Sequence, residues 1–193
     1  MDLGGKINNG VLFQNIKYLI FTLYQNALRR EAQGKYEMAS LLLYRILEML
    51  SQSRFWRMGI DTEKVKKEQY NALGINPDSL LRKINNIKKK IGDKPLDALP
   101  QEISLIMGYI ILGVLDDELI KTDNENMLVG RIKEIKGRVI SRNVGIFAHG
   151  FKFQDKDSYE KFKYTVTEYL MRYCEVEGID MDEISKESEF ISL

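Results

Sequence analysis

Apolar residues recur every three or four positions along most of the chain, which is the spacing of one face of an α-helix. A first stripe over about 11–33 and a second over about 36–58 are separated by Gly34. The first contains Phe13, Ile16, Ile20, Leu23 and Ala27, and the second contains Ala39, Leu42, Leu43, Ile46, Leu47 and Leu50. We predict two antiparallel helices joined by a tight turn.

The segment 61–100 is polar and irregular, and it contains the lysine run 88–90. Asp78 is a good N-cap residue, so we predict that it begins a helix running through SLLRKINNIKKKI. We interpret the lysine run as a solvated helix face, with an RNA contact as the alternative.

An apolar run, ISLIMGYIILGVL, occupies residues 103–115. A membrane helix needs about 20 such residues, so we predict instead a central helix over about 101–120 that is buried on all sides. Asp123 or Asn124 is placed to cap a further helix, whose apolar positions are Leu128, Ile132, Ile135, Val139 and Ile146. A last helix is predicted over about 158–175.

Composition agrees with a folded helical protein. Hydrophobic residues make up 44% and charged residues 30%, and only three prolines interrupt the chain. The predicted fold class is all-α: a single-domain helical bundle with an irregular helical insertion around 61–100.

The chain has one cysteine, Cys174, and one histidine, His149. A structural zinc site needs about four ligands, so we expect no metal and no cofactor. We expect Cys174 to be a packed thiol in a reducing, cytoplasmic protein. No leader peptide and no membrane segment is visible, so a membrane partner is not expected.

Charge is unevenly distributed. Residues 1–100 carry 17 Lys and Arg against 10 Asp and Glu, whereas residues 101–193 carry 12 against 18. Most of the acidic excess lies in the tail from Tyr173 onward, and we expect its segment GIDMDEISKESEF to be frayed. A basic body is compatible with an anionic partner. Asp116, Asp117 and Glu118 form a weak metal candidate, and we interpret them as solvated surface at a helix end.

The candidate chemistry lies in SRNVGIFAHG, where six residues separate Arg142 from His149. Histidine can both take and give a proton near neutral pH, and arginine binds phosphate oxygens. Asn143 can add a hydrogen bond. RNA carries its own nucleophile, the 2′-OH, so these groups would suffice to cleave it without a metal. The alternative is that His149 only ends a helix before Gly150.

On a straight helix Arg142 and His149 point the same way but lie roughly 10 Å apart along the axis. A kink at Gly145 could bring them closer, and so could contact with a second copy of the helix across a two-fold axis.

Two stretches resemble known HEPN domains. RNVGIFAHGF resembles the arginine-to-histidine motif of these domains, in which four to six residues separate the two side chains. ALRREAQGKYEMASLLLYRILEMLSQSRFWRMGIDTEKV is similar to their first helix pair, including Tyr44, Arg45 and Glu48. We interpret Arg45 and Glu48, at i and i+3, as a structural pair. The likeness covers most of residues 12–175 and is closest to the C-terminal HEPN half of CRISPR-associated CARF–HEPN ribonucleases of type III systems.

The resemblance implies a HEPN-type homodimer that cleaves single-stranded RNA without a metal, through a composite site at the dimer interface. It implies that Arg142, Asn143 and His149 are catalytic, that the products end in a 2′,3′-cyclic phosphate, and that the protein acts in antiviral defence. We expect Lys136, Arg138 and Lys152 to contact RNA.

The expected domain organisation is a linker or loop over 1–11, a HEPN domain over 12–177 and an acidic tail over 178–193. A CARF sensor of cyclic oligoadenylates is an expected partner domain, but nothing in this chain resembles its parallel strands. The loop-like start favours a fragment over a stand-alone HEPN protein. Two alternatives remain: a non-catalytic HEPN module for dimerisation or RNA binding, and a helical scaffold of tetratricopeptide type, suggested by the single turn EAQGKYEMA.

Overall fold

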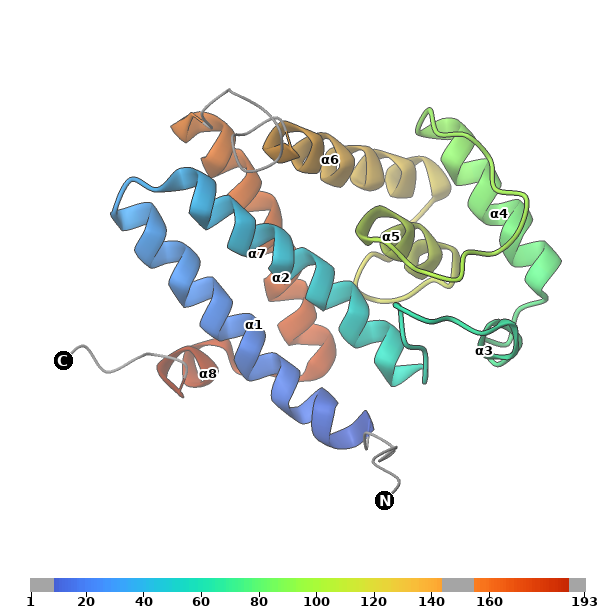
Figure 1. Ribbon diagram of the computed structural model, residues 1–193, viewed down its shortest axis with the longest axis horizontal. Coiled ribbons are helices and arrows are strands. Elements are labelled where there is room, and N and C mark those ends of the chain that lie inside the picture. The colour runs from blue at the N-terminus through green and yellow to red at the C-terminus, as the bar shows by residue number, and fades with distance from the viewer. Residues whose placement is uncertain (1–8, 144–154, 188–193) are drawn as a thin grey trace, which may run out of the picture.

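The computed structural model describes residues 9–143 and 155–187. In these ranges the protein is all-α, with eight helices and no strand, as predicted (Figure 1). In chain order the helices are α1 (Asn9–Ala32), α2 (Tyr36–Arg57), α3 (Lys67–Asn71), α4 (Pro77–Lys90), α5 (Leu105–Val114), α6 (Glu125–Asn143), α7 (Lys156–Glu177) and α8 (Met181–Glu187).

Helices α1 and α2 form the predicted antiparallel hairpin. Its turn depends on Gly34, whose φ of 70° lies in the left-handed region that glycine adopts without strain. The hairpin packs against α7, and the three helices share a core of large buried side chains. Among these are Ile20, Phe21, Leu43, Leu50, Phe162 and Tyr173.

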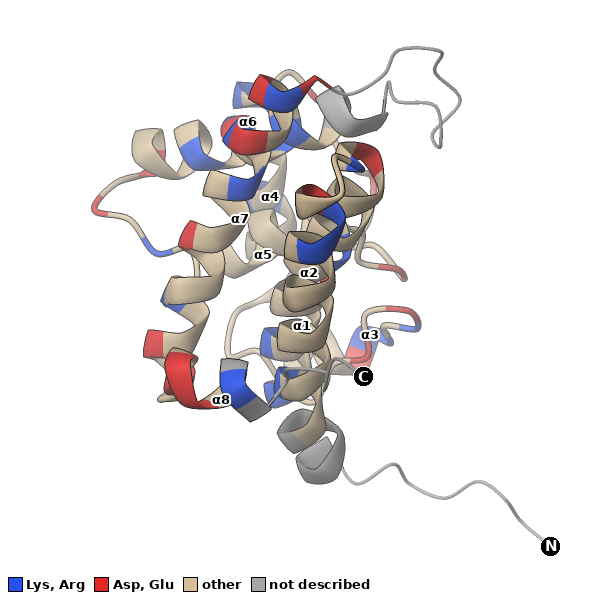
Figure 2. Cartoon of the chain, turned by 90° about the vertical axis from the view of Figure 1, so that its left-hand side faces the viewer, with Lys and Arg blue, Asp and Glu red and all other residues tan. Residues whose placement is uncertain are grey.

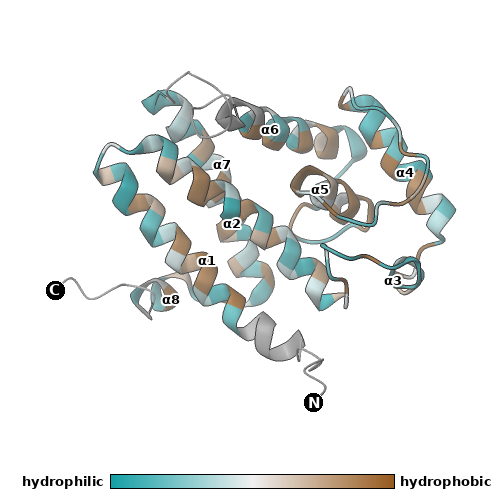
Figure 3. Ribbon diagram, in the orientation of Figure 1, coloured by the Kyte–Doolittle hydropathy of each residue, from teal (hydrophilic) through white to brown (hydrophobic). Residues whose placement is uncertain are grey.

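Helix α5 is the predicted central helix, and Figure 3 shows hydrophobic residues around most of its surface. Seven of its residues are buried: Leu105, Met107, Gly108, Tyr109, Ile110, Ile111 and Leu112. A Cβ on Gly108 would lie 3.0 Å from Oγ of Ser51, so glycine lets α5 approach α2 closely. The helix is shorter than the predicted 101–120, because Asp116 adopts a φ of 59° and turns the chain away.

The segment 61–100 is the predicted irregular insertion, and it contains α3 and α4. Asp78 does not cap α4: Oδ1 of Asn76 accepts hydrogen bonds from the backbone N–H groups of Asp78 and Ser79, at 3.0 and 3.1 Å. Pro77 is therefore the first residue of the helix, where its missing N–H costs nothing. Helix α4 buries Leu80, Ile84 and Ile87 and packs on α5.

The expectation of a frayed tail is wrong for residues 178–187. Gly178 ends α7 in the left-handed conformation, and α8 follows and packs against α1. Ile184 is the buried anchor of α8, with 3% of its surface exposed. The carboxylate of Asp180 accepts the N–H groups of Asp182 and Glu183, so an acidic residue caps the helix.

Candidate functional site

Arg142 and Asn143 are the last two residues of α6. Their side chains lie outside the described part of the structure, as do Gly145, His149 and Lys152 in full. The structure therefore places the backbone of Arg142 and Asn143 at the C-terminal end of α6, while the arrangement of Arg142 relative to His149 lies outside the described residues.

Helix α6 is anchored by its N-terminal cap and by buried residues between 128 and 139. The side-chain oxygen of Asn124 accepts the N–H of Met127 at 3.0 Å, which confirms Asn124 as one of the two expected caps. Ile132 and Ile135 are fully buried. On the flank that faces α7, Oγ1 of Thr165 lies 3.1 Å from a carboxylate oxygen of Glu134. Arg142 and Asn143 are thus the last residues of a helix whose preceding turns are packed against the core.

The start of α7 lies at the same end of the molecule as the end of α6 (Figure 1). Asp155 caps α7 by accepting the N–H of Ser158 at 2.8 Å. Glu31, near the end of α1, accepts bonds from Nζ of Lys163 at 2.6 Å and from the hydroxyl of Tyr159 at 3.1 Å. Burial and the charge of Glu31 raise the pKa of Tyr159 far above its usual value, so this hydroxyl stays a donor.

The expected RNA contacts on α6 face different neighbours. Nζ of Lys136 lies 2.5 Å from Oδ1 of Asp93 and 3.4 Å from the carbonyl oxygen of Ile91, in the turn after α4. Arg138 lies on the Glu134 flank, with 3.8 Å between Nη2 and Oε1. Nε of Arg138 is buried without a hydrogen-bond partner among the described residues. Position 142 comes one helical turn after Arg138.

The pair on α2 forms as expected: Nη1 of Arg45 lies 2.5 Å from Oε2 of Glu48. Both side chains are partly exposed, so the pair contributes little to stability. Tyr44, beside it in the sequence, packs against the core.

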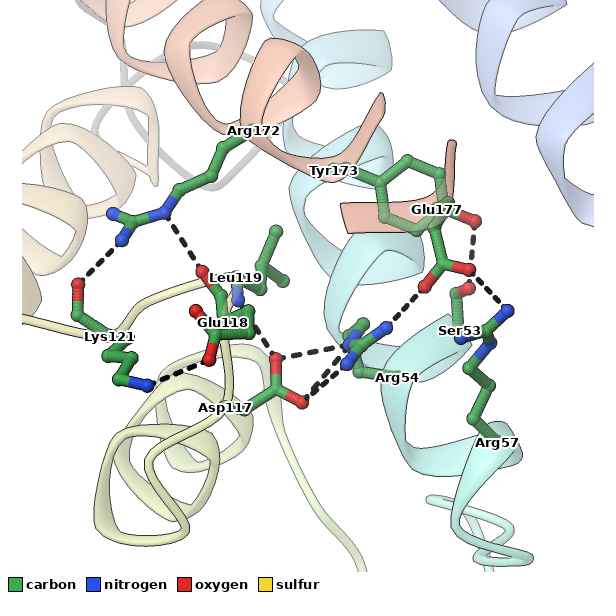
Figure 4. A network of polar contacts seen from close by, with 10 residues as sticks. All are labelled: Ser53, Arg54, Arg57, Asp117, Glu118, Leu119, Lys121, Arg172, Tyr173 and Glu177. Carbon is green, nitrogen blue, oxygen red and sulfur yellow. Dashed lines mark hydrogen bonds and ion pairs between the residues drawn. The ribbon is translucent and has the colours of Figure 1, made fainter. Parts of the chain in front are cut away.

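A buried ion network lies near the other end of α2, and sequence patterns did not predict it (Figure 4). Arg54 bonds to both carboxylate oxygens of Asp117, with 2.9 Å between Nη2 and Oδ2. Arg54 also pairs with Glu177 of α7, and Arg57 binds the second oxygen of Glu177 at 2.9 Å. Burial alone would lower the pKa of Arg54, but the two carboxylates outweigh it and raise this pKa.

The network corrects the interpretation of Asp117 as solvated. Its side chain is only 3% exposed, and Oδ1 also accepts the N–H of Leu119 at 3.0 Å. The loop after α5 and the end of α7 are thus both fixed to α2. Arg54 lies 18 residues after Tyr36, the first residue of α2, or roughly 27 Å along its axis. The network joins the end of α2 to the loop after α5 and to the end of α7, and Figure 1 shows this end of α2 well away from the end of α6.

Cys174 is a buried free thiol, as expected. Over residues 9–143 and 155–187, no three His, Cys, Asp or Glu side chains are grouped so that they could hold a metal ion. None of the described helices is long and apolar enough to cross a membrane.

The eight helices of the described residues form a bundle, which places the protein in the all-α class. The family model described as the Csm6 HEPN domain matches residues 8–173, from the start of α1 almost to the end of α7. The chain therefore belongs to the Csm6 HEPN domain family and is a CRISPR-associated HEPN domain. No curated protein gives a significant match.

Proposed function

We propose that this domain is a metal-independent endoribonuclease that cleaves single-stranded RNA in CRISPR antiviral defence. Membership of the Csm6 HEPN family over residues 8–173 is the observation that carries the proposal, because domains of this family are generally ribonucleases. The position of Arg142 and Asn143 at the C-terminal end of a packed helix supports it.

The proposed reaction is a transesterification within the RNA. The 2′-oxygen attacks the neighbouring phosphorus, the bond from phosphorus to the 5′-oxygen breaks, and the products carry a 2′,3′-cyclic phosphate and a 5′-hydroxyl. His149 moves a proton, from the 2′-OH or to the leaving oxygen. Arg142 stabilises the charge that develops on the phosphate, and Asn143 donates a hydrogen bond to it.

Two copies of the domain would build one composite site. Positions 142 and 149 would be roughly 10 Å apart along a straight helix. At that separation, the arginine and the histidine of one copy could not both contact a single phosphate. A two-fold axis near the end of α6 would bring two arginines and two histidines into one cleft.

Labelled single-stranded RNA incubated with the protein in EDTA tests this function. We expect cleavage to persist and the products to end in 2′,3′-cyclic phosphate. Strict dependence on magnesium or manganese would contradict the mechanism. Binding of RNA with no cleavage would identify the domain as a non-catalytic HEPN module instead.

A further inference from the structure

The positive charge of the chain is concentrated in two helices. Residues 77–94, which contain α4 and the turn after it, and residues 125–143 of α6 together carry 11 Lys and Arg against 4 Asp and Glu. The whole chain has a net charge of only +1. Figure 2 shows basic residues along α6 at one end of the molecule and acidic residues in α8 at the opposite end.

These two basic helices lie next to each other. Both pack on α5. Asn86 of α4 donates a hydrogen bond of 2.9 Å to Glu125, the first residue of α6, and Lys90 pairs with the same carboxylate. The bond from Lys136 to Asp93 then joins the turn after α4 to the middle of α6.

The lysine run 88–90 is not uniform. Lys88 is half-buried, Lys90 is exposed and paired with Glu125, and Lys89 is exposed with no ion pair among the described residues. Other exposed cations accompany it on α4 and on the turn that follows. Lys89 and three of these cations have no ion-pair partner within the described ranges, and we call the four residues the basic ridge: Arg82, Lys83, Lys89 and Lys94.

The basic ridge leads towards the candidate motif. Arg82 and Lys89 are seven residues apart, or roughly 10 Å along α4. Lys94 follows Asp93, and Asp93 forms an ion pair with Lys136 of α6. Positions 136 and 142 are separated by roughly 9 Å along the axis of α6. The spacing of Arg82 and Lys89 is close to the screening length of about 10 Å at moderate salt, so these two cations act on one another's counterions and not as isolated charges.

We propose that the basic ridge binds the phosphates of single-stranded RNA outside the cleavage point and so extends the substrate path from α6 onto α4. This inference rests on the proposed function, because it takes Arg142 as the place where RNA is cut. An RNA strand is a suitable ligand because its phosphates repeat along its backbone, and Arg82 and Lys89, seven residues apart, lie on the same face of α4. A membrane fits it poorly, because the apolar face of α4 is already buried against α5.

A matched pair of triple variants tests the ridge. The first is Arg82→Gln/Lys89→Gln/Lys94→Gln. The control is Lys64→Gln/Lys66→Gln/Lys67→Gln, which removes the same charge from exposed lysines that line a cleft of 770 Å³ beside α3, near the start of α4. These lysines have no ion-pair partner in the described structure either. Binding is measured with both variants in the His149→Ala background, so that RNA is not consumed.

We expect the ridge variant to bind a long single-stranded RNA more weakly, by roughly five-fold at about 0.1 M salt for each phosphate that the ridge no longer holds. The slope of log affinity against log salt should fall by about 0.7 for each of these phosphates. The control should leave both quantities unchanged. Equal weakening in both variants, or unchanged affinity in the ridge variant, would overturn the ridge as a specific site.

Cleavage by the active chain separates this inference from the proposed function. With His149 present, the ridge variant should have a raised KM for long RNA and a normal rate on the shortest RNA that the wild type cuts. A lower rate on the shortest RNA as well would mean damage to the site and would overturn the ridge. A wild type that binds RNA through the ridge but cuts none of it would leave the ridge standing and overturn the nuclease.

Discussion

His149 is the only histidine of the protein, and the proposed chemistry depends on it because histidine is the residue type that can both take and give a proton near neutral pH. We expect His149→Ala and Arg142→Ala each to lower RNA cleavage by roughly 10²–10⁴-fold, because each removes a group that acts on the reacting phosphate. The rate is measured on labelled RNA.

Circular dichroism controls for folding in that experiment, since both variants should keep their helical content. Cleavage by both variants at the wild-type rate would remove these residues from the mechanism. Unfolding of both would mean that the residues are structural.

Asp117 is a second residue with a large expected effect, on stability and not on catalysis. Asp117→Ala would leave the buried Arg54 with Glu177 as its remaining carboxylate partner. We expect this change to lower the free energy of unfolding by roughly 3 kcal/mol. Glu118→Ala is the matched control, because Glu118 is exposed and pairs with the exposed Lys121. Urea denaturation measures both variants. Equal effects would mean that the Arg54 network is not a stabilising contact.

Cys174 gives a prediction about pH. Burial raises the pKa of its thiol to about 11. In the unfolded chain the pKa of a cysteine thiol is about 8.5, so the folded state holds this proton more tightly. The contribution of this thiol to folding stability is therefore present at a pH below the pKa that it has in the unfolded chain. It is lost as the pH rises through the pKa that it has in the folded protein.

At mildly alkaline pH we therefore expect iodoacetamide to modify Cys174 at least roughly 100-fold more slowly in the folded protein than in urea, since each pKa unit changes the thiolate fraction tenfold. Mass spectrometry follows the reaction. Equal rates in the two states would show that the thiol is not buried.

At the scale of elements, replacing glycine by alanine should change the stability of the protein in opposite directions at two positions. Gly34 needs its positive φ to end α1, so Gly34→Ala should lower stability by roughly 1 kcal/mol. Gly130 lies inside α6, and a Cβ there would meet nothing within 4 Å, so Gly130→Ala should raise stability by roughly 0.5–1 kcal/mol. Thermal unfolding measures both, and the same sign for both would contradict the assigned roles.

Periodicity is enough to predict the hairpin, the central helix and the two long helices after it, because each contributes a continuous apolar stripe to the core. Two features that were predicted wrongly do have a local signal. Pro77 fits the first position of a helix, which makes Asn76 the cap in preference to Asp78. Ile184, in the acidic tail, follows the good cap residue Asp180 and anchors α8.

Other features could not be predicted, because they depend on partners far away in the sequence. Nothing near Asp117 indicates that it meets Arg54, 63 positions earlier. The lysine run likewise looks uniform until the structure pairs Lys90 with Glu125 and gives Lys89 no ion pair among the described residues. Of the candidate site, only the helical placement of Arg142 and Asn143 can be compared with the prediction, since His149 lies outside the described residues.

At the scale of the whole molecule, we expect a two-fold dimer whose interface contains the end of α6. Two copies would supply the paired arginines and histidines that one copy holds too far apart. Light scattering measures the mass, and the nuclease rate per protomer should rise with protein concentration as the dimer forms. A strict monomer that cleaves RNA would refute the composite site.

The Arg54 network also affects the order in which the protein folds. Its partners lie 63 and 123 positions from Arg54 in the sequence. We expect these bonds to form late in folding, because distant parts of the chain must first come together. The hairpin of α1 and α2 joins neighbours in the sequence and can form much earlier. An interaction that is absent from the folding transition state acts on the unfolding rate and leaves the folding rate nearly unchanged. We therefore expect the network to act mainly on the unfolding rate of the domain and the hairpin mainly on its folding rate.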